Sequence, residues 1–101
     1  MKVIRTTMPD GSYWDVPASL VANHRAEYYA QKETGQNHGA KYVEEFNREY
    51  DYAMSDPYEL FDWCRNNINW SDIKVHATKA SESECDYEDG WTNGDKEIVE
   101  I

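Results

Sequence analysis

The sequence predicts an α+β domain, in which a small antiparallel sheet carries about three helices on one face. Three observations predict it. Residues 2–16 alternate like a β-hairpin, residues 17–68 repeat apolar side chains at helical spacing, and residues 96–101 form a short closing strand. A chain of 101 residues has material for one core, so residues 1–101 are expected to form a single domain.

The hairpin is predicted from local composition. Residues 2–8 and 12–16 are rich in β-branched and aromatic side chains. Residues 9–11 between them read Pro-Asp-Gly, which suits a turn because Pro presets φ and Gly accepts a positive φ.

A first helix is predicted to begin at Pro17, since the N–H that proline lacks would have no partner in the first turn. It should end near Gly35, and residues 34–39 should form a polar, mobile turn. Its expected buried stripe, at helical spacing, is Leu20, Val21, His24 and Tyr28.

Two further helices are predicted between Ala40 and Asn67. The second should bury Val43, Phe46, Tyr50, Ala53 and Met54 and turn Glu44, Glu45, Arg48, Glu49 and Asp51 toward water. Asp56 and Glu59 form a capping box, in which Asp56 accepts the backbone amide at N3 and Glu59 reaches back. The third helix should bury Leu60, Phe61, Cys64 and Ile68.

The C-terminal third is expected to return to the sheet. Residues 73–80 alternate like a half-covered strand, and residues 81–89 have little to bury, which predicts a flexible loop. Asn93-Gly94 is a turn signal before the strand at residues 96–101.

The charge is strongly acidic and unevenly placed. The chain has 10 Lys and Arg against 20 Asp and Glu, a net charge of −10. Residues 1–40 are balanced, so all of the excess falls in residues 41–101. Such a field disfavours direct nucleic-acid binding and anionic membranes, and it attracts proteins with a basic surface.

No membrane span or signal peptide is predicted, because no apolar run approaches about 18 residues. Cys64 and Cys85 are expected to be free thiols in a reducing compartment. These features predict a soluble protein of the cytoplasm.

No catalytic residue, metal site or cofactor is predicted. The chain has no P-loop, dinucleotide fingerprint, nucleophile elbow or zinc-protease motif. A calcium loop before Gly90 fails because Cys85 and Tyr87 stand at ligand positions. No two of His24, His38, His76, Cys64 and Cys85 stand at ligand spacing. The protein is therefore expected not to be an enzyme.

The residues expected to contact a partner are the acids and aromatic side chains of the second and third helices. Tyr and Trp are common anchors at protein interfaces. The predicted set is Glu44, Glu45, Glu49, Asp51, Tyr52, Tyr58, Asp62 and Trp63. The competing interpretation is a solvated charged surface around an aromatic-rich core.

Four segments resemble small acidic proteins encoded by tailed bacteriophages. They are residues 8–17 (MPDGSYWDVP), 58–63 (YELFDW), 69–73 (NWSDI) and 89–94 (DGWTNG). The resemblance implies a phage origin and the host cytoplasm as location, and it implies no catalytic residues. Short acidic phage products often bind host proteins, including defence complexes.

Three functions remain open at this stage. The first is inhibition of a basic, nucleic-acid-handling host protein, such as a defence effector, by a nucleic-acid mimic or an interface blocker. The second is a nucleotide or small-molecule sponge at a self-association interface, with Arg25, Lys32 and residues 35–39 as the only phosphate cradle. The third is a phage structural or assembly component.

Overall fold

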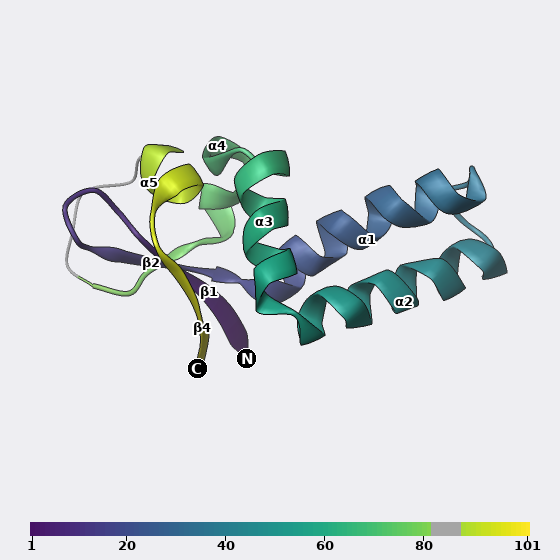
Figure 1. Cartoon of the computed structure of the whole chain (residues 1–101), viewed down its shortest axis with the longest axis horizontal. Helices are drawn as coiled ribbons and strands as arrows, with labels where there is room; N and C mark the ends of the chain where they lie inside the picture. Colours follow the sequence, from purple (N-terminus) through teal and green to yellow (C-terminus); the bar gives the residue numbers. More distant parts are fainter. Residues whose placement is uncertain (82–87) are drawn as a thin grey trace.

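A computed structural model describes residues 1–81 and 88–101 and confirms the α+β fold (Figure 1). The expected flexible loop at residues 81–89 lies mostly outside the described residues. The elements in order are β1 (Lys2–Thr7), β2 (Tyr13–Pro17), α1 (Ala18–Thr34), α2 (Ala40–Ser55), α3 (Pro57–Asn67), α4 (Trp70–Ile73), the 3₁₀ turn η1 (Lys74–His76), β3 (Thr78–Lys79), α5 (Glu88–Asn93) and β4 (Lys96–Glu100).

The sheet has four antiparallel strands in the order β3-β2-β1-β4, so the hairpin and the closing strand are confirmed. Ile4 lies between Val16 and Ile98 across the strands, and all three pack into the core. Arg5, one residue later, lies on the opposite face because successive side chains alternate. There its guanidinium donates two hydrogen bonds to Asp15, at 2.9 and 3.0 Å.

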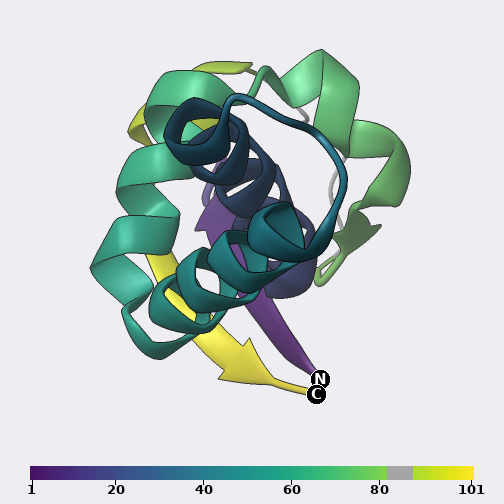
Figure 2. The same ribbon diagram turned by 90° about the vertical axis from the view of Figure 1, so that its right-hand side faces the viewer.

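Helices α1 and α2 form an antiparallel hairpin that extends away from the sheet (Figures 1 and 2). Helix α1 also contacts β1 and β2, while α2 packs on α1 and α3. Ala22, Ala26 and Ala30 are fully buried at helical spacing along α1. Small side chains at these positions let a neighbouring helix approach closely.

The predicted stripe of α1 is therefore partly wrong. Val21 is buried as expected, but Leu20 is half-buried and His24 and Tyr28 are exposed. Their places on the inner side are taken by alanines and by Arg25. In α2, Ala53 is buried and Phe46, Tyr50 and Met54 are half-buried, whereas Val43 is exposed.

The core around α4 and α5 is built largely from tryptophan side chains. Trp91 is completely buried, and its Nε1 donates to the Ile68 carbonyl at 2.8 Å. Its ring lies 5.6 Å from that of Trp70, which meets Trp14 edge-on at 5.5 Å. Leu60, Cys64 and Ile68 of the third helical segment are buried as predicted, and Phe61 is half-buried.

The predicted strand at residues 73–80 is mostly wrong. Trp70 and Ile73 are three residues apart and both buried, so this stretch begins as helix α4, continues as η1, and pairs with β2 only at Thr78–Lys79. The Asn93-Gly94 turn is likewise the end of a short helix, α5. The described residues thus contain two short helices beyond the three expected.

Gly94 lies where α5 meets the sheet. Its N–H donates to the Gly90 carbonyl at 2.9 Å, and the next carbonyl, of Asp95, accepts from the Thr7 N–H at 2.9 Å. A side-chain carbon at position 94 would overlap the carbonyl oxygens of Thr7 and Gly90. Glycine is needed here because two backbone segments approach each other closely.

We expect Gly94→Ala to lower the free energy of unfolding by about 3 kcal/mol, because the added methyl group has no room and the backbone must shift. Urea denaturation measures the change. Asn37→Ala, in the exposed turn between α1 and α2, is the control and should stay within about 0.5 kcal/mol of the parent. Equal stability of the two variants would contradict the close approach.

Candidate protein-binding surface on helices α2 and α3

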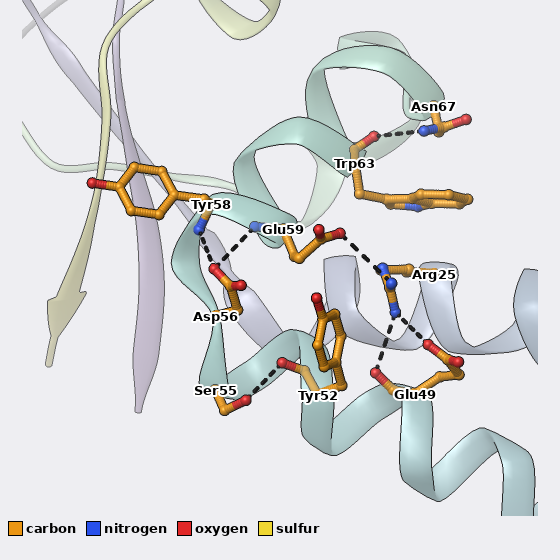
Figure 3. A network of polar contacts seen from close by, with 9 residues as sticks. All are labelled: Arg25, Glu49, Tyr52, Ser55, Asp56, Tyr58, Glu59, Trp63 and Asn67. Carbon is orange, nitrogen blue, oxygen red and sulfur yellow. Dashed lines mark hydrogen bonds and ion pairs between the residues drawn. The ribbon is translucent and has the colours of Figure 1, made fainter.

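Arg25 is a buried cation at the meeting point of α1, α2 and α3 (Figure 3). It is 7% exposed. Its Nη1 donates to the Glu49 carboxylate at 2.7 Å, and its Nη2 lies 3.6 Å from the Glu59 carboxylate. One side chain of α1 thus neutralises an acid from each of the two following helices.

Two tyrosines complete the surroundings of this guanidinium. Its carbon lies 4.6 Å from the ring centre of Tyr29 and 5.1 Å from that of Tyr52. The Nε of Arg25 is buried and has no hydrogen-bond partner among the described residues. The cation is therefore held by two carboxylates and two aromatic faces, and water contributes little.

The Arg25 contacts correct two predictions. Glu49 was expected to face water, and its half-buried carboxylate instead faces α1. The capping box is half confirmed: Asp56 accepts from the N–H groups of Tyr58 and Glu59, at 3.1 and 3.4 Å. The Glu59 carboxylate lies beside Arg25, and the Asp56 N–H donates to the Ala53 carbonyl.

Trp63, expected at a partner interface, is 8% exposed and belongs to the core. Its ring lies 5.4 Å from that of Tyr28 and 5.5 Å from that of Tyr29. Its Nε1 donates to Nδ1 of His24 at 2.9 Å. A side chain enclosed in this way joins α3 to α1 and offers little surface to another protein.

Glu45 is also less available than expected. It is half-buried, and it pairs with Arg48 one turn along the same helix at 2.7 Å. Glu44 pairs with the same guanidinium at 3.7 Å but is exposed.

Five of the eight predicted contact residues are exposed, and we call this set the acidic face. Tyr58 is 81% exposed and Tyr52 is 48% exposed. The set is Glu44, Asp51, Tyr52, Tyr58 and Asp62. Glu44 and Asp51 lie seven residues apart on α2, and Tyr58 and Asp62 four apart on α3, so each pair shares one side of its helix. Tyr58 and Asp62 line a depression together with Arg65 and Lys96, whereas the Tyr52 ring faces Arg25.

Two titratable groups, Cys64 and Lys96, lie between α3 and β4, and Lys96 lines the same depression as Tyr58 and Asp62. Burial raises the pKa of the Cys64 thiol to about 11, and burial lowers the pKa of the Lys96 ammonium to about 8. Lys96 donates to the hydroxyl of Thr6 at 2.9 Å and to the carbonyl of Trp91. Between pH 8 and 10.5 the Lys96 ammonium has lost its proton in the folded chain and keeps it in the unfolded chain. The contribution of Lys96 to the free energy of unfolding therefore increases with pH across this range.

The described residues offer no metal site, since no three His, Cys, Asp or Glu side chains among them are grouped suitably. The described helices also include none that is long and apolar enough to cross a membrane. In the predicted phosphate cradle, Arg25 is committed to Glu49 and Glu59, which leaves Lys32 and the turn at residues 35–39 at the surface.

Sequence reasoning missed the position of Arg25 between α1, α2 and α3. The available signal was the alanine spacing at 22, 26 and 30, which marks the inner side of α1 and places Arg25 on it. No protein-family model, curated protein sequence or solved structure matches this chain.

Replacing Arg25 by Met should lower the free energy of unfolding by about 2 to 3 kcal/mol, because the facing carboxylates lose their counter-charge. The value lies at the lower end for buried pairs since Glu49 and Glu59 retain some contact with water. Urea denaturation provides the measurement.

The matched control is Arg48→Met, which removes an exposed ion pair and should cost less than about 1 kcal/mol. Adding Glu49→Gln to Arg25→Met should recover part of the loss. Equal effects of the two arginine replacements would contradict the role of Arg25.

Cys64 should react slowly with thiol reagents in the folded protein. With a pKa of about 11, its thiolate population at pH 8 is about 100-fold below that of the same thiol in the unfolded chain. A Cys85→Ser variant isolates the reaction, and 8 M urea supplies the unfolded reference. The native rate should rise about tenfold per pH unit from 8 to 10. A native rate close to that in urea would show that the thiol is not buried.

Proposed function

We propose that this protein is a phage-encoded, non-enzymatic inhibitor that acts in the host cytoplasm on a basic, nucleic-acid-handling protein such as a defence effector. The acidic face of α2 and α3 occupies the surface on which that protein holds nucleic acid. The observation that carries the proposal is that Glu44, Asp51, Asp62, Tyr52 and Tyr58 are all exposed on these two helices.

The division of the acids into two groups supports this proposal. Glu49 and Glu59 are neutralised within the fold by Arg25, and Glu45 is paired with Arg48. Asp51 and Asp62 are exposed, and neither has a Lys or Arg within ion-pair distance among the described residues. Exposed acids without an internal counter-charge raise the rate at which a basic partner is found.

The two tyrosines, Tyr52 and Tyr58, add aromatic contacts to the attraction between charges. Tyr58 sits at the second position of α3, where the Asp56 cap fixes the start of the helix. The Tyr52 ring is held on its inner side by Arg25. The Tyr58 ring meets the Phe61 ring edge-on, with 6.3 Å between the ring centres. A phenol can pack on an Arg or Lys of the partner.

The experiment is capture of partners from a lysate of the host, followed by affinity measurement on the identified protein. A variant with Glu44→Gln, Asp51→Asn and Asp62→Asn should bind the captured protein at least tenfold more weakly. The salt dependence of the remaining binding should also be flatter, because screened charge contributes less to it.

The matched control removes the same charge elsewhere, with Glu27→Gln on α1, Asp89→Asn and Glu97→Gln. It should keep nearly the parent affinity, because in the described part of the chain these exposed acids share no depression with the residues of the acidic face. Equal losses of affinity in the two triple variants would show that only net charge matters, and would overturn the assignment of the binding surface. Capture of proteins without a basic surface would count against the inhibitor proposal as a whole.

A further inference from the structure

A depression of about 230 Å³ lies between α1, the end of α3, and the α4–η1 segment, away from the acidic face. Leu20, Ile68 and Ile73 supply its apolar part, and Ile68 and Ile73 are buried. A cavity of about 150 Å³ holds a benzene ring, so this depression has room for one ring and a short chain.

The rim of this depression consists mainly of hydrogen-bond acceptors. Glu27 of α1 and Asp72 of α4 bring a carboxylate from opposite sides. Asn23 uses its NH₂ group on Glu27 at 3.3 Å, and Asn67 uses its NH₂ group on the Trp63 carbonyl at 3.2 Å. The amide oxygens of both asparagines therefore remain to accept. None of the residues that line the depression is Lys or Arg, and two of them are histidines, His24 and His76.

The imidazole of His24 has a defined state at this rim. An indole N–H can only donate, so Nδ1 of His24 must accept from Trp63, and neutral His24 carries its proton on Nε2. The rim and the core are thus connected through one hydrogen bond. A molecule bound in the depression will change the surroundings of the Trp63 indole N–H.

We propose that this depression binds a small primary amine with an apolar body. The ammonium group donates three hydrogen bonds, which suits two carboxylates and two amide oxygens, and its charge is opposite to theirs. The apolar body covers Leu20, Ile68 and Ile73. The size of the depression limits that body to about one ring, which favours an arylalkylamine over a nucleotide.

The test uses 2-phenylethylamine as the probe and 2-phenylethanol as its uncharged counterpart. The four indole N–H signals of the ¹⁵N-labelled full chain are followed by NMR during titration. The Trp63 signal should shift saturably at millimolar amine, whereas Trp14, which does not line the depression, serves as the reference. The alcohol should bind about tenfold more weakly, because its hydroxyl is uncharged and donates one hydrogen bond where the ammonium donates three.

A variant with Glu27→Gln and Asp72→Asn should lose most of the preference for the amine while retaining the alcohol's weak shift. Both side chains are exposed, so the fold should survive, and the amide spectrum verifies it. Glu33→Gln with Asp89→Asn removes equal charge elsewhere and should leave amine binding unchanged. No Trp63 shift at 20 mM amine, equal shifts with amine and alcohol, or equal loss in both double variants would overturn the proposal.

Discussion

The helical half of this protein depends on one desolvated cation. Ala53 is the one fully buried residue of α2, and half-buried Tyr50 and Met54 also pack this helix against the core. Arg25 adds ionic contacts to this packing, because it binds Glu49 of α2 and Glu59 of α3 from a position inside α1. Its cost of desolvation is recovered only when both acids and both tyrosine rings are in place, which specifies one arrangement of the three helices.

This constraint also decides which acids are available for function. An acidic sequence could place its carboxylates anywhere on the surface, yet the fold uses Glu49 and Glu59 internally and directs Asp51, Asp62 and Glu44 outward. The Asp56 cap starts α3 directly after α2 and places Tyr58 in the first turn of α3. The contacts that stabilise the helices therefore also determine which of these side chains are exposed.

Local chemistry was enough to predict part of the fold. Pro-Asp-Gly at residues 9–11, Gly35 at the end of α1 and Asp56 before α3 act on the backbone within a few residues, so the hairpin and the helix boundaries could be predicted. The stretch at residues 73–80 could not, because it continues from α4, whose first residue Trp70 packs on Trp91, and local sequence does not show that contact. Trp63 and Arg25 were misjudged for the same reason, since residue type gives exposure only on average and three helices meet at these two side chains.

The most direct measurement for the central claim is displacement of nucleic acid from the captured host protein. Labelled DNA or RNA bound to that protein is titrated with the parent chain, and release is followed by fluorescence anisotropy. If the acidic face occupies the nucleic-acid surface, one equivalent of the parent chain should release all of the nucleic acid when both proteins are well above their dissociation constant. The Glu44, Asp51 and Asp62 triple variant should release little. A ternary complex in which the nucleic acid stays bound would contradict the claim.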